Sequence, residues 1–199
     1  RSSTIILRDY QRGVTQSVVP ATQGVLELPT GFGKTAIGCE LIHELGLKTL
    51  VIVPKLDLLT QWEVEAKKFL PGYDIGAING KRHVIGDVTI ATIQTLSRRV
   101  EEGTMDPDEF GLIIGDEAHT MVSEIARKTI GHFNAGRRYG LTATCRRTDG
   151  QGEAIHFIWG PTLVTKEMDR ATPAVVIVEN EELLYVEEYA DMIEKQTKS

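Results

Sequence analysis

One glycine-rich loop constrains this chain more than any other feature of its sequence. It lies between an apolar run at residues 25–28 and a segment, residues 34–45, whose apolar side chains recur at helical spacing. The loop reads Pro-Thr-Gly-Phe-Gly-Lys-Thr over residues 29–35. A buried strand that turns through glycines directly into a helix is typical of parallel α/β architecture, because parallel strands need helical crossovers. The loop therefore predicts a chain built from strand and helix units.

Further short apolar runs, rich in β-branched residues, follow along the chain. They span residues 49–53, 87–91, 112–115 and 139–141. A second helical segment at residues 58–70 places Trp62, Ala66 and Leu70 on one face. The runs are mostly apolar on both faces rather than alternating, which is typical of strands buried in a parallel sheet. We therefore predict an α/β fold with a mostly parallel sheet and helices on both of its faces.

Composition excludes several classes of protein. Lys and Arg number 22 against 28 Asp and Glu, so the formal net charge is −6 and any binding to nucleic acid requires a local basic patch. The longest apolar runs, residues 50–53 and 174–178, are far shorter than the ~18 residues of a membrane span, so we expect no membrane partner. Cys39 and Cys145 do not make a disulfide framework, which favours an intracellular location, cytoplasmic or nuclear.

The segment after residue 159 differs from the rest of the chain. Residues 174–178 follow a proline and predict one more strand, and residues 181–195 form an acidic stretch with apolar side chains near helical spacing. A peripheral helix, a linker and a partner-binding helix all fit this stretch. Because the chain begins with Arg rather than Met, we expect a processed product or an excised fragment.

The glycine-rich loop has the chemistry of a phosphate cradle. Glycines let successive backbone N–H groups point at phosphate oxygens, and the helix that follows adds the positive end of its dipole. Lys34 can reach the β- and γ-phosphates of a nucleotide, while the Thr35 hydroxyl can ligate Mg²⁺. The strict pattern G-x-x-x-x-G-K-[ST] fails at its first position, where Leu28 stands. The alternative is a glycine-rich turn that carries a surface lysine.

Two carboxylates follow the apolar run at residues 110–115. An open parallel sheet binds its ligand at the carboxyl ends of its strands, which is where Asp116 and Glu117 would lie. Asp116 would hold Mg²⁺ through water, and Glu117 would polarise a water molecule that attacks the γ-phosphate. The alternative is a solvated helix start, where acidic residues are common.

Taken in order, these motifs resemble the first motor domain of superfamily 2 helicases of the DEAH type. The nearest resemblance is to XPB-type repair helicases and to phage and restriction-enzyme motors, and it spans roughly residues 4–165. The matching segments are residues 7–11, 28–35, 51–55 with 61–62, 91–96, 116–119 and 141–144, the last extended by Arg147, Asp149 and Gly150. Cys145 stands where the family usually has Pro, which puts the rigidity of that segment in doubt.

The resemblance implies a role for each matched residue. Arg8 and Gln11 would bind the adenine, and the amide of Gln11 suits its N6 and N7 edge. His119, Thr142 and Thr144 would couple the nucleotide to the nucleic acid. The remaining ATP-binding residues would be Leu28, Pro29, Thr30, Gly31, Phe32, Gly33, Lys34 and Thr35, and the nucleic-acid backbone would touch Pro54, Lys55, Thr92 and Gln94. Solvated Gln, Arg and Lys side chains, a turn-capping Thr and strand-filling threonines remain alternatives.

The resemblance implies a RecA-like P-loop NTPase domain at residues 1–165, followed at 166–199 by a terminal strand and an acidic helix or linker. Its function would be that of the N-terminal motor lobe of an ATP-dependent helicase or translocase that uses ATP and Mg²⁺. DNA is favoured over RNA by analogy alone. The second motor domain of the family, with its arginine finger, is absent from this chain, so we expect weak turnover in isolation. The alternative is an ATP-binding switch that recruits a partner without turnover.

Overall fold

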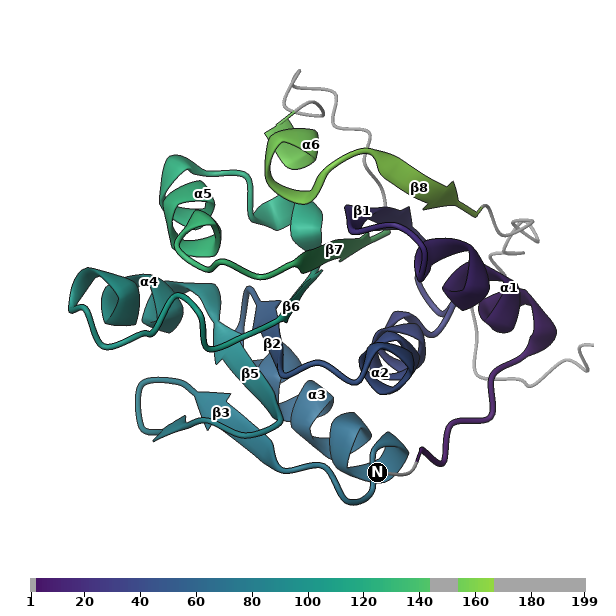
Figure 1. Cartoon of the computed structure of the whole chain (residues 1–199), viewed down its shortest axis with the longest axis horizontal. Helices are drawn as coiled ribbons and strands as arrows, with labels where there is room; N and C mark the ends of the chain where they lie inside the picture. Colours follow the sequence, from purple (N-terminus) through teal and green to yellow (C-terminus); the bar gives the residue numbers. More distant parts are fainter. Residues whose placement is uncertain (1–2, 144–153, 167–199) are drawn as a thin grey trace, which may run out of the picture. The chain divides into compact units, whose positions relative to one another are not determined.

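The computed structural model describes residues 3–143 and 154–166. These residues form an eight-stranded sheet in the order β4-β3-β5-β2-β6-β7-β1-β8, flanked by helices (Figure 1). The strands are β1 (Gln23–Glu27), β2 (Thr49–Val53), β3 (Ile75–Ile78), β4 (His83–Val84), β5 (Val88–Thr92), β6 (Leu112–Asp116), β7 (Arg137–Thr142) and β8 (Thr162–Thr165). The helices are α1 (Asp9–Val18), α2 (Lys34–Leu45), α3 (Leu56–Phe69), α4 (Ile93–Glu101), the 3-10 turn η1 (Ala118–Thr120), α5 (Glu124–Gly131) and α6 (Ala154–Trp159).

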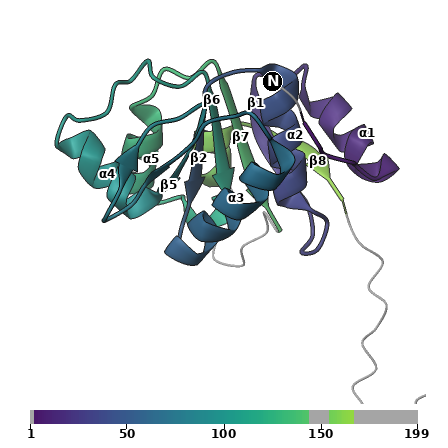
Figure 2. The same ribbon diagram turned by 90° about the horizontal axis from the view of Figure 1, so that it is seen from below.

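The sheet is parallel apart from the short edge strand β4, which pairs antiparallel with β3. Helices α1, α2 and α3 lie on one face, and α4, α5 and α6 lie on the other (Figures 1 and 2). The buried apolar side chains divide into two clusters along the same line, one beneath each layer of helices. This arrangement confirms the predicted α/β fold with a mostly parallel sheet.

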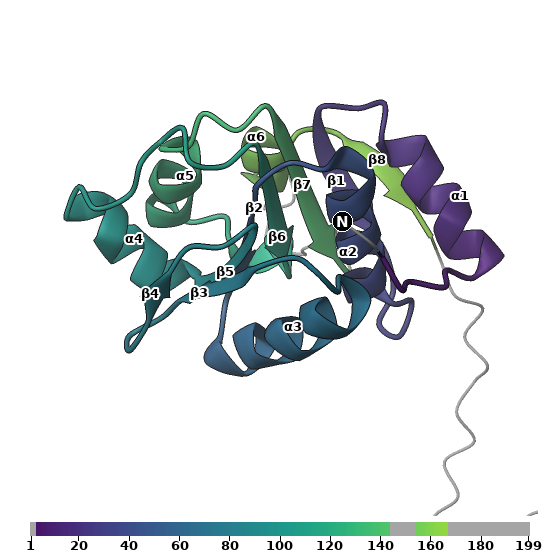
Figure 3. The same cartoon turned by 60° about the horizontal axis from the view of Figure 1, so that its bottom comes forward.

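The central strands show why their sequences lack polar alternation. Every residue of β2 is buried, with Val51 and Val53 in one apolar cluster and Leu50 and Ile52 in the other. A strand covered on both faces must be apolar at successive positions, whereas a half-exposed strand alternates. The pattern of residues 49–53 therefore follows from the position of β2 near the middle of the sheet, which Figure 3 shows from another side.

The predicted boundaries agree closely with the structure in the strongest segments. The helix predicted at residues 34–45 and the strand predicted at 49–53 have the observed bounds. The other elements predicted within the described residues differ by one or two residues at their ends. Leu28 was wrongly placed in the first strand, because β1 ends at Glu27. Thr92, just outside the run predicted at residues 87–91, is the last residue of β5.

Some sequence predictions fall outside the described residues. These are the strand at residues 174–178, the acidic helix at 181–195, and Thr144, Cys145, Arg147, Asp149 and Gly150 of the segment after β7. Within residues 3–143 and 154–166, no helix is both long enough and apolar enough to cross a bilayer.

Candidate functional site

The loop that follows β1 takes a conformation that depends on its glycines. Gly31 and Gly33 have φ angles of 81° and 85°, in the left-handed region that side chains with a Cβ rarely adopt. A Cβ on Gly31 would meet nothing within 4 Å, so the space beside the loop is open. Gly33 is the N-cap of α2 and has no side chain to cap the first amides of that helix. The open glycine loop and the uncapped amides at the start of α2 therefore fit an anionic group such as a phosphate.

Gln11 joins the first helix to this loop. Its Nε2 donates a hydrogen bond to the Phe32 carbonyl at 2.8 Å, and its Oε1 accepts one from the Arg8 backbone N–H at 2.9 Å. The side chain is buried against Gly33, where a Cβ would lie 2.4 Å from the same Nε2. The amide keeps a second N–H and further lone pairs, which is the capacity that adenine recognition needs.

An aromatic contact extends this cluster. The Tyr10 ring packs against Phe32 with centroids 4.7 Å apart, and Arg8 Nη1 donates to the Tyr10 hydroxyl at 2.9 Å. Tyr10 nevertheless remains exposed. No separate role for Tyr10 was predicted from the sequence, although an aromatic residue between Arg8 and Gln11 is a signal that could have indicated one.

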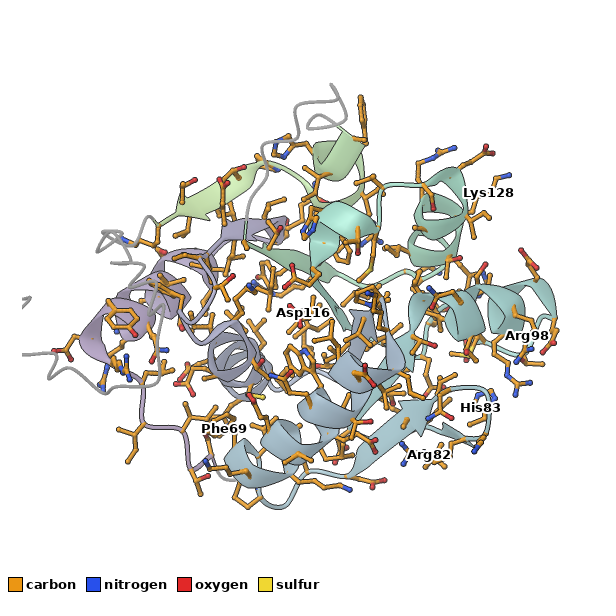
Figure 4. The ribbon with its side chains drawn as sticks, turned by 180° about the vertical axis from the view of Figure 1, so that it is seen from behind. Phe69, Arg82, His83, Arg98, Asp116 and Lys128 are labelled. Atoms are coloured by element: carbon orange, nitrogen blue, oxygen red, sulfur yellow. The ribbon has the colours of Figure 1, made fainter. Side chains whose placement is uncertain are left out.

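Asp116 is the most buried acidic side chain of the site and is held from two sides. It is the last residue of β6, and Figure 4 shows it in the interior. Its Oδ2 accepts a hydrogen bond from Trp62 Nε1 at 2.8 Å, and its Oδ1 accepts one from the Glu117 backbone N–H at 3.0 Å. Burial raises the pKa of Asp116 above its ordinary value, although the Trp62 hydrogen bond and the charge of Lys34 oppose this effect.

Lys34 and Glu117 meet between the loop and β6. Lys34 Nζ lies 3.5 Å from Glu117 Oε1, and both side chains are less than one third exposed, at 13% and 29%. Glu117 has a φ angle of 52° and is the single non-glycine residue with positive φ in the described part of the chain. This left-handed residue turns the chain sharply from β6 into η1, with the Thr120 N–H bonded back to its carbonyl at 2.8 Å.

His119 connects the Glu117 carboxylate to β7. Its Nδ1 lies 2.8 Å from the Thr142 hydroxyl and 3.4 Å from Glu117 Oε2. Thr142 is fully buried at the end of β7, and its carbonyl accepts a hydrogen bond from the Leu28 N–H at 2.8 Å. The structure thus brings the segments at residues 28–35, 116–119 and 141–142 together.

The four residues predicted to touch nucleic acid lie along the same edge of the sheet, beyond β6. Lys55 is exposed at the N-cap of α3, and Gln94 is exposed at the start of α4. Gln94 Nε2 donates to the Pro54 carbonyl at 3.1 Å, which joins the two segments. Thr92 is buried and its hydroxyl bonds to that of Thr95, so it is the least accessible of the four.

Asp116 and Thr35 are the described residues that fit a magnesium ion at this edge of the sheet. The described residues hold no group of three His, Cys, Asp or Glu side chains placed to bind a metal. Mg²⁺ is commonly bound by one or two protein oxygens together with phosphates and water, which suits Asp116 and the half-buried Thr35. Both residues stand at the carboxyl edge, one at the end of β6 and one in the first turn of α2.

The fold and the family match assign the chain to the N-terminal domains of superfamily 2 helicases, with a RecA-like architecture. The chain belongs to the family described as type III restriction enzyme, res subunit, which it matches over residues 4–147.

Individual relatives agree with this assignment. The chain is 32% identical to the DNA 3'-5' translocase XPB2 of Sulfurisphaera tokodaii over 92% of its length and 40% of that protein. It is 36% identical to the DNA 3'-5' helicase XPB of Mycobacterium tuberculosis over 78% of its length and 29% of that protein. The chain therefore spans less than half the length of these curated relatives.

Solved structures share the fold. The chain matches the Sulfolobus solfataricus SWI2/SNF2 ATPase core in complex with dsDNA at a TM-score of 0.67 and 22% identity, over 79% of this chain and 36% of that one. It matches the UvsW helicase of bacteriophage T4 at a TM-score of 0.62 and 23% identity, over 82% and 62% of the two chains. At these identities the likeness concerns the fold alone.

Proposed function

We propose that this chain is the ATP-binding motor lobe of a DNA helicase or translocase of the DEAH type. The observation that carries the proposal is the meeting of Lys34 with Glu117, beside a buried Asp116, at the start of a helix that follows a glycine loop. Basic, acidic and backbone N–H groups converge there as phosphoryl transfer requires. The sequence Asp-Glu-Ala-His at residues 116–119 supports the DEAH subclass.

Each residue of the site has a proposed task. The amides at the start of α2 and the Lys34 ammonium hold the β- and γ-phosphates, while Gln11 and Arg8 take the adenine. Asp116 and Thr35 hold Mg²⁺, which neutralises charge on the phosphates when it is bound. Pro29, Thr30, Gly31, Phe32 and Gly33 shape the loop, with Leu28 ahead of it.

Hydrolysis needs a base beside the γ-phosphate. Glu117 is less buried than Asp116, and its carboxylate oxygens face Lys34 and His119. We assign Glu117 to accept a proton from the attacking water, while His119 and Thr142 transmit the state of the nucleotide to β7. Thr144, outside the described residues, is proposed to share this coupling role.

The proposed nucleic-acid contact is the exposed edge formed by Pro54, Lys55, Thr92 and Gln94. Contacts of this kind go to the phosphate backbone and are independent of sequence. DNA is proposed as the partner because the relatives named above are a DNA translocase and a DNA helicase. We also propose that residues 1–165 form the lobe, that 166–199 lead toward a second motor domain, and that the protein works inside the cell.

Titration of the chain with ATP and with GTP in the presence of Mg²⁺ tests the proposal. We expect saturable binding that favours ATP, and a loss of at least ~100-fold in affinity in Lys34→Ala, because a charge-assisted contact to phosphate is removed. Lys128→Ala is the matched control, since Lys128 is exposed on α5 and remote from Asp116 (Figure 4). Equal affinities in the two variants would contradict the proposed site.

Measurement of ATP hydrolysis distinguishes the proposed helicase or translocase from the alternative, an ATP-binding switch. Glu117→Gln should bind Mg·ATP as the wild-type chain does, because the phosphate contacts remain. The wild-type chain joined to a second motor domain should hydrolyse ATP, and Glu117→Gln in the same fusion should not. Binding without turnover in the wild-type fusion would favour the ATP-binding switch instead.

A further inference from the structure

Trp62 makes a contact that the proposed function does not use. It lies in α3, is fully buried, and donates its indole N–H to Asp116 Oδ2 at 2.8 Å, across 54 residues of sequence. The indole N–H is a donor only, and a bond to a carboxylate is stronger than a neutral one. Asp116 is the residue proposed to hold Mg²⁺, so this bond reaches the metal ligand directly.

The fold makes room for this indole. A Cβ on Gly38 of α2 would lie 2.6 Å from Trp62 Cη2, so the ring packs directly against the backbone of α2. The ring is therefore confined between α3 and α2, and its N–H is directed at the end of β6. Any side chain larger than glycine at residue 38 would displace it.

A second buried tryptophan shows that burial alone does not require such a bond. Trp159 packs on the other face of the sheet, where Cβ atoms on Gly115 and Gly140 would lie 2.2 Å and 2.9 Å from its ring. It is as fully buried as Trp62, yet its Nε1 has no hydrogen-bond partner among the described residues. The Trp62 bond is thus a specific contact and not a consequence of packing a tryptophan in this sheet.

The hydrogen bond from Trp62 orients the Asp116 carboxylate and leaves it able to bind a metal ion. The backbone N–H of Glu117 holds Oδ1 at 3.0 Å and the indole holds Oδ2, so donors fix both oxygens. A carboxylate has about four lone-pair sites, and these two bonds use two of them. The remaining sites can accept a metal or its bound water in one orientation of the carboxylate.

We propose that Trp62 is a positioning residue for Mg²⁺, which holds the Asp116 carboxylate in the orientation that binds the metal. This inference rests on the proposed function, because it assumes that Asp116 serves Mg·ATP. Groups that orient a metal ligand in this way typically change metal affinity by about 10–100-fold when removed.

The test compares Trp62→Phe with Trp159→Phe. Both variants lose one indole from the two sides of the same sheet, but Trp62→Phe alone loses a hydrogen bond to Asp116. ATP affinity is measured by calorimetry with Mg²⁺ and with EDTA, and the ratio of the two gives the Mg²⁺ enhancement. We expect Trp62→Phe to lower this enhancement about 10-fold while its affinity in EDTA stays within about 2-fold of wild type. Trp159→Phe should change neither.

The outcomes of these measurements distinguish failure of the positioning role of Trp62 from failure of the proposed ATP-binding function. An unchanged enhancement in Trp62→Phe, or an equal loss of affinity with and without Mg²⁺, would overturn the positioning role and leave the ATP site in place. A wild-type chain that binds no ATP, or binds it without dependence on Mg²⁺, would overturn the proposed function and the inference with it. In an Asp116→Ala background, Trp62→Phe should lower the enhancement no further.

A measurement on the wild-type chain keeps the inference testable if Trp62→Phe does not fold. The two indole N–H groups give separate resonances in a ¹⁵N-correlated spectrum, and Trp159→Phe identifies which is which. Addition of Mg²⁺ to the ATP-bound chain should shift the Trp62 resonance more than that of Trp159. A Trp62 resonance that does not respond to Mg²⁺ would overturn the inference.

Discussion

Two halves of the carboxyl edge of the sheet differ in how their polar side chains are held. In the half around β1, β6 and β7, here called the ordered half, polar side chains contact one another, Trp62 or the backbone at 2.8–3.5 Å. These side chains are Gln11, Lys34, Asp116, Glu117 and His119. In the half that follows β2 and β5, here called the open half, the side chains of Lys55 and Gln94 are exposed. The contrast matches the ligands proposed for each half. A nucleotide is bound in one geometry and needs fixed groups, whereas a nucleic-acid backbone is bound by charge along its length.

Helix α3 belongs to both halves. Its N-cap residue, Lys55, lies in the open half. Trp62, about two turns further along the helix, donates a hydrogen bond to Asp116 in the ordered half. A shift of α3 would therefore move the exposed end and the indole together. Substitutions at corresponding residue types in the molecule therefore test how strongly the two halves differ.

The largest effect is expected at the glycines. Gly33→Ala should lower the free energy of unfolding by about 2–3 kcal/mol, because the left-handed φ is costly for alanine and its Cβ would break the bond from Gln11 to Phe32. Gly80→Ala, in the turn after β3, should change it by less than ~0.5 kcal/mol, since a Cβ there meets nothing. Denaturant unfolding measures both, and equal losses would contradict the special role of the left-handed Gly33 beside Gln11.

A glutamine pair gives the next largest effect. Gln11→Ala removes two hydrogen bonds of a buried amide and should destabilise the chain by about 1–2 kcal/mol, with loss of the preference for ATP over GTP. Gln94→Ala removes one exposed bond to Pro54 and should cost less than ~0.5 kcal/mol. If Gln94→Ala proved as destabilising as Gln11→Ala, the two halves would be equally ordered.

Glu117 tests the strained backbone of the ordered half. Because left-handed φ favours glycine, Glu117→Gly should be more stable than Glu117→Ala by about 1 kcal/mol, the reverse of the usual order in regular structure. Both variants lose the carboxylate, so their difference isolates the backbone. Thermal unfolding of the two proteins measures it, and a more stable alanine variant would mean that Glu117 is not left-handed in solution.

The smallest effect is expected in the open half. Lys55→Ala should weaken DNA binding about 5-fold and reduce the salt dependence by about one unit of slope, because one phosphate contact is lost. Its ATP affinity should remain that of the wild type. Fluorescence anisotropy with labelled DNA at several salt concentrations measures this, with Lys128→Ala as the control of equal charge. An equal effect of both variants would show that Lys55 acts through net charge alone.

Much of the fold could be predicted because the strongest signals are local. Helix α2 and strand β2 were predicted with their observed bounds, since helical spacing and an unbroken apolar run leave few alternatives. Strands β3, β4 and β8 were missed because they are short and carry weak patterns. In β3, Gly76 is needed because a Cβ there would lie 2.3 Å from the Val84 carbonyl, a contact that exists only after β4 folds back.

The candidate site also has a part that could be predicted from the sequence and a part that could not. The groups that carry the proposed chemistry could be predicted from the sequence, since the glycine loop with Lys34 and the pair Asp116 and Glu117 form recognisable local motifs. The contacts that hold these groups in place could not be predicted from the sequence. They are the Trp62 bond to Asp116, the Gln11 bond to Phe32 and the His119 contact with Thr142. These contacts join residues 21 to 54 positions apart. Local propensity acts over a few residues, so contacts at such separations exist only once the sheet has brought the strand ends together.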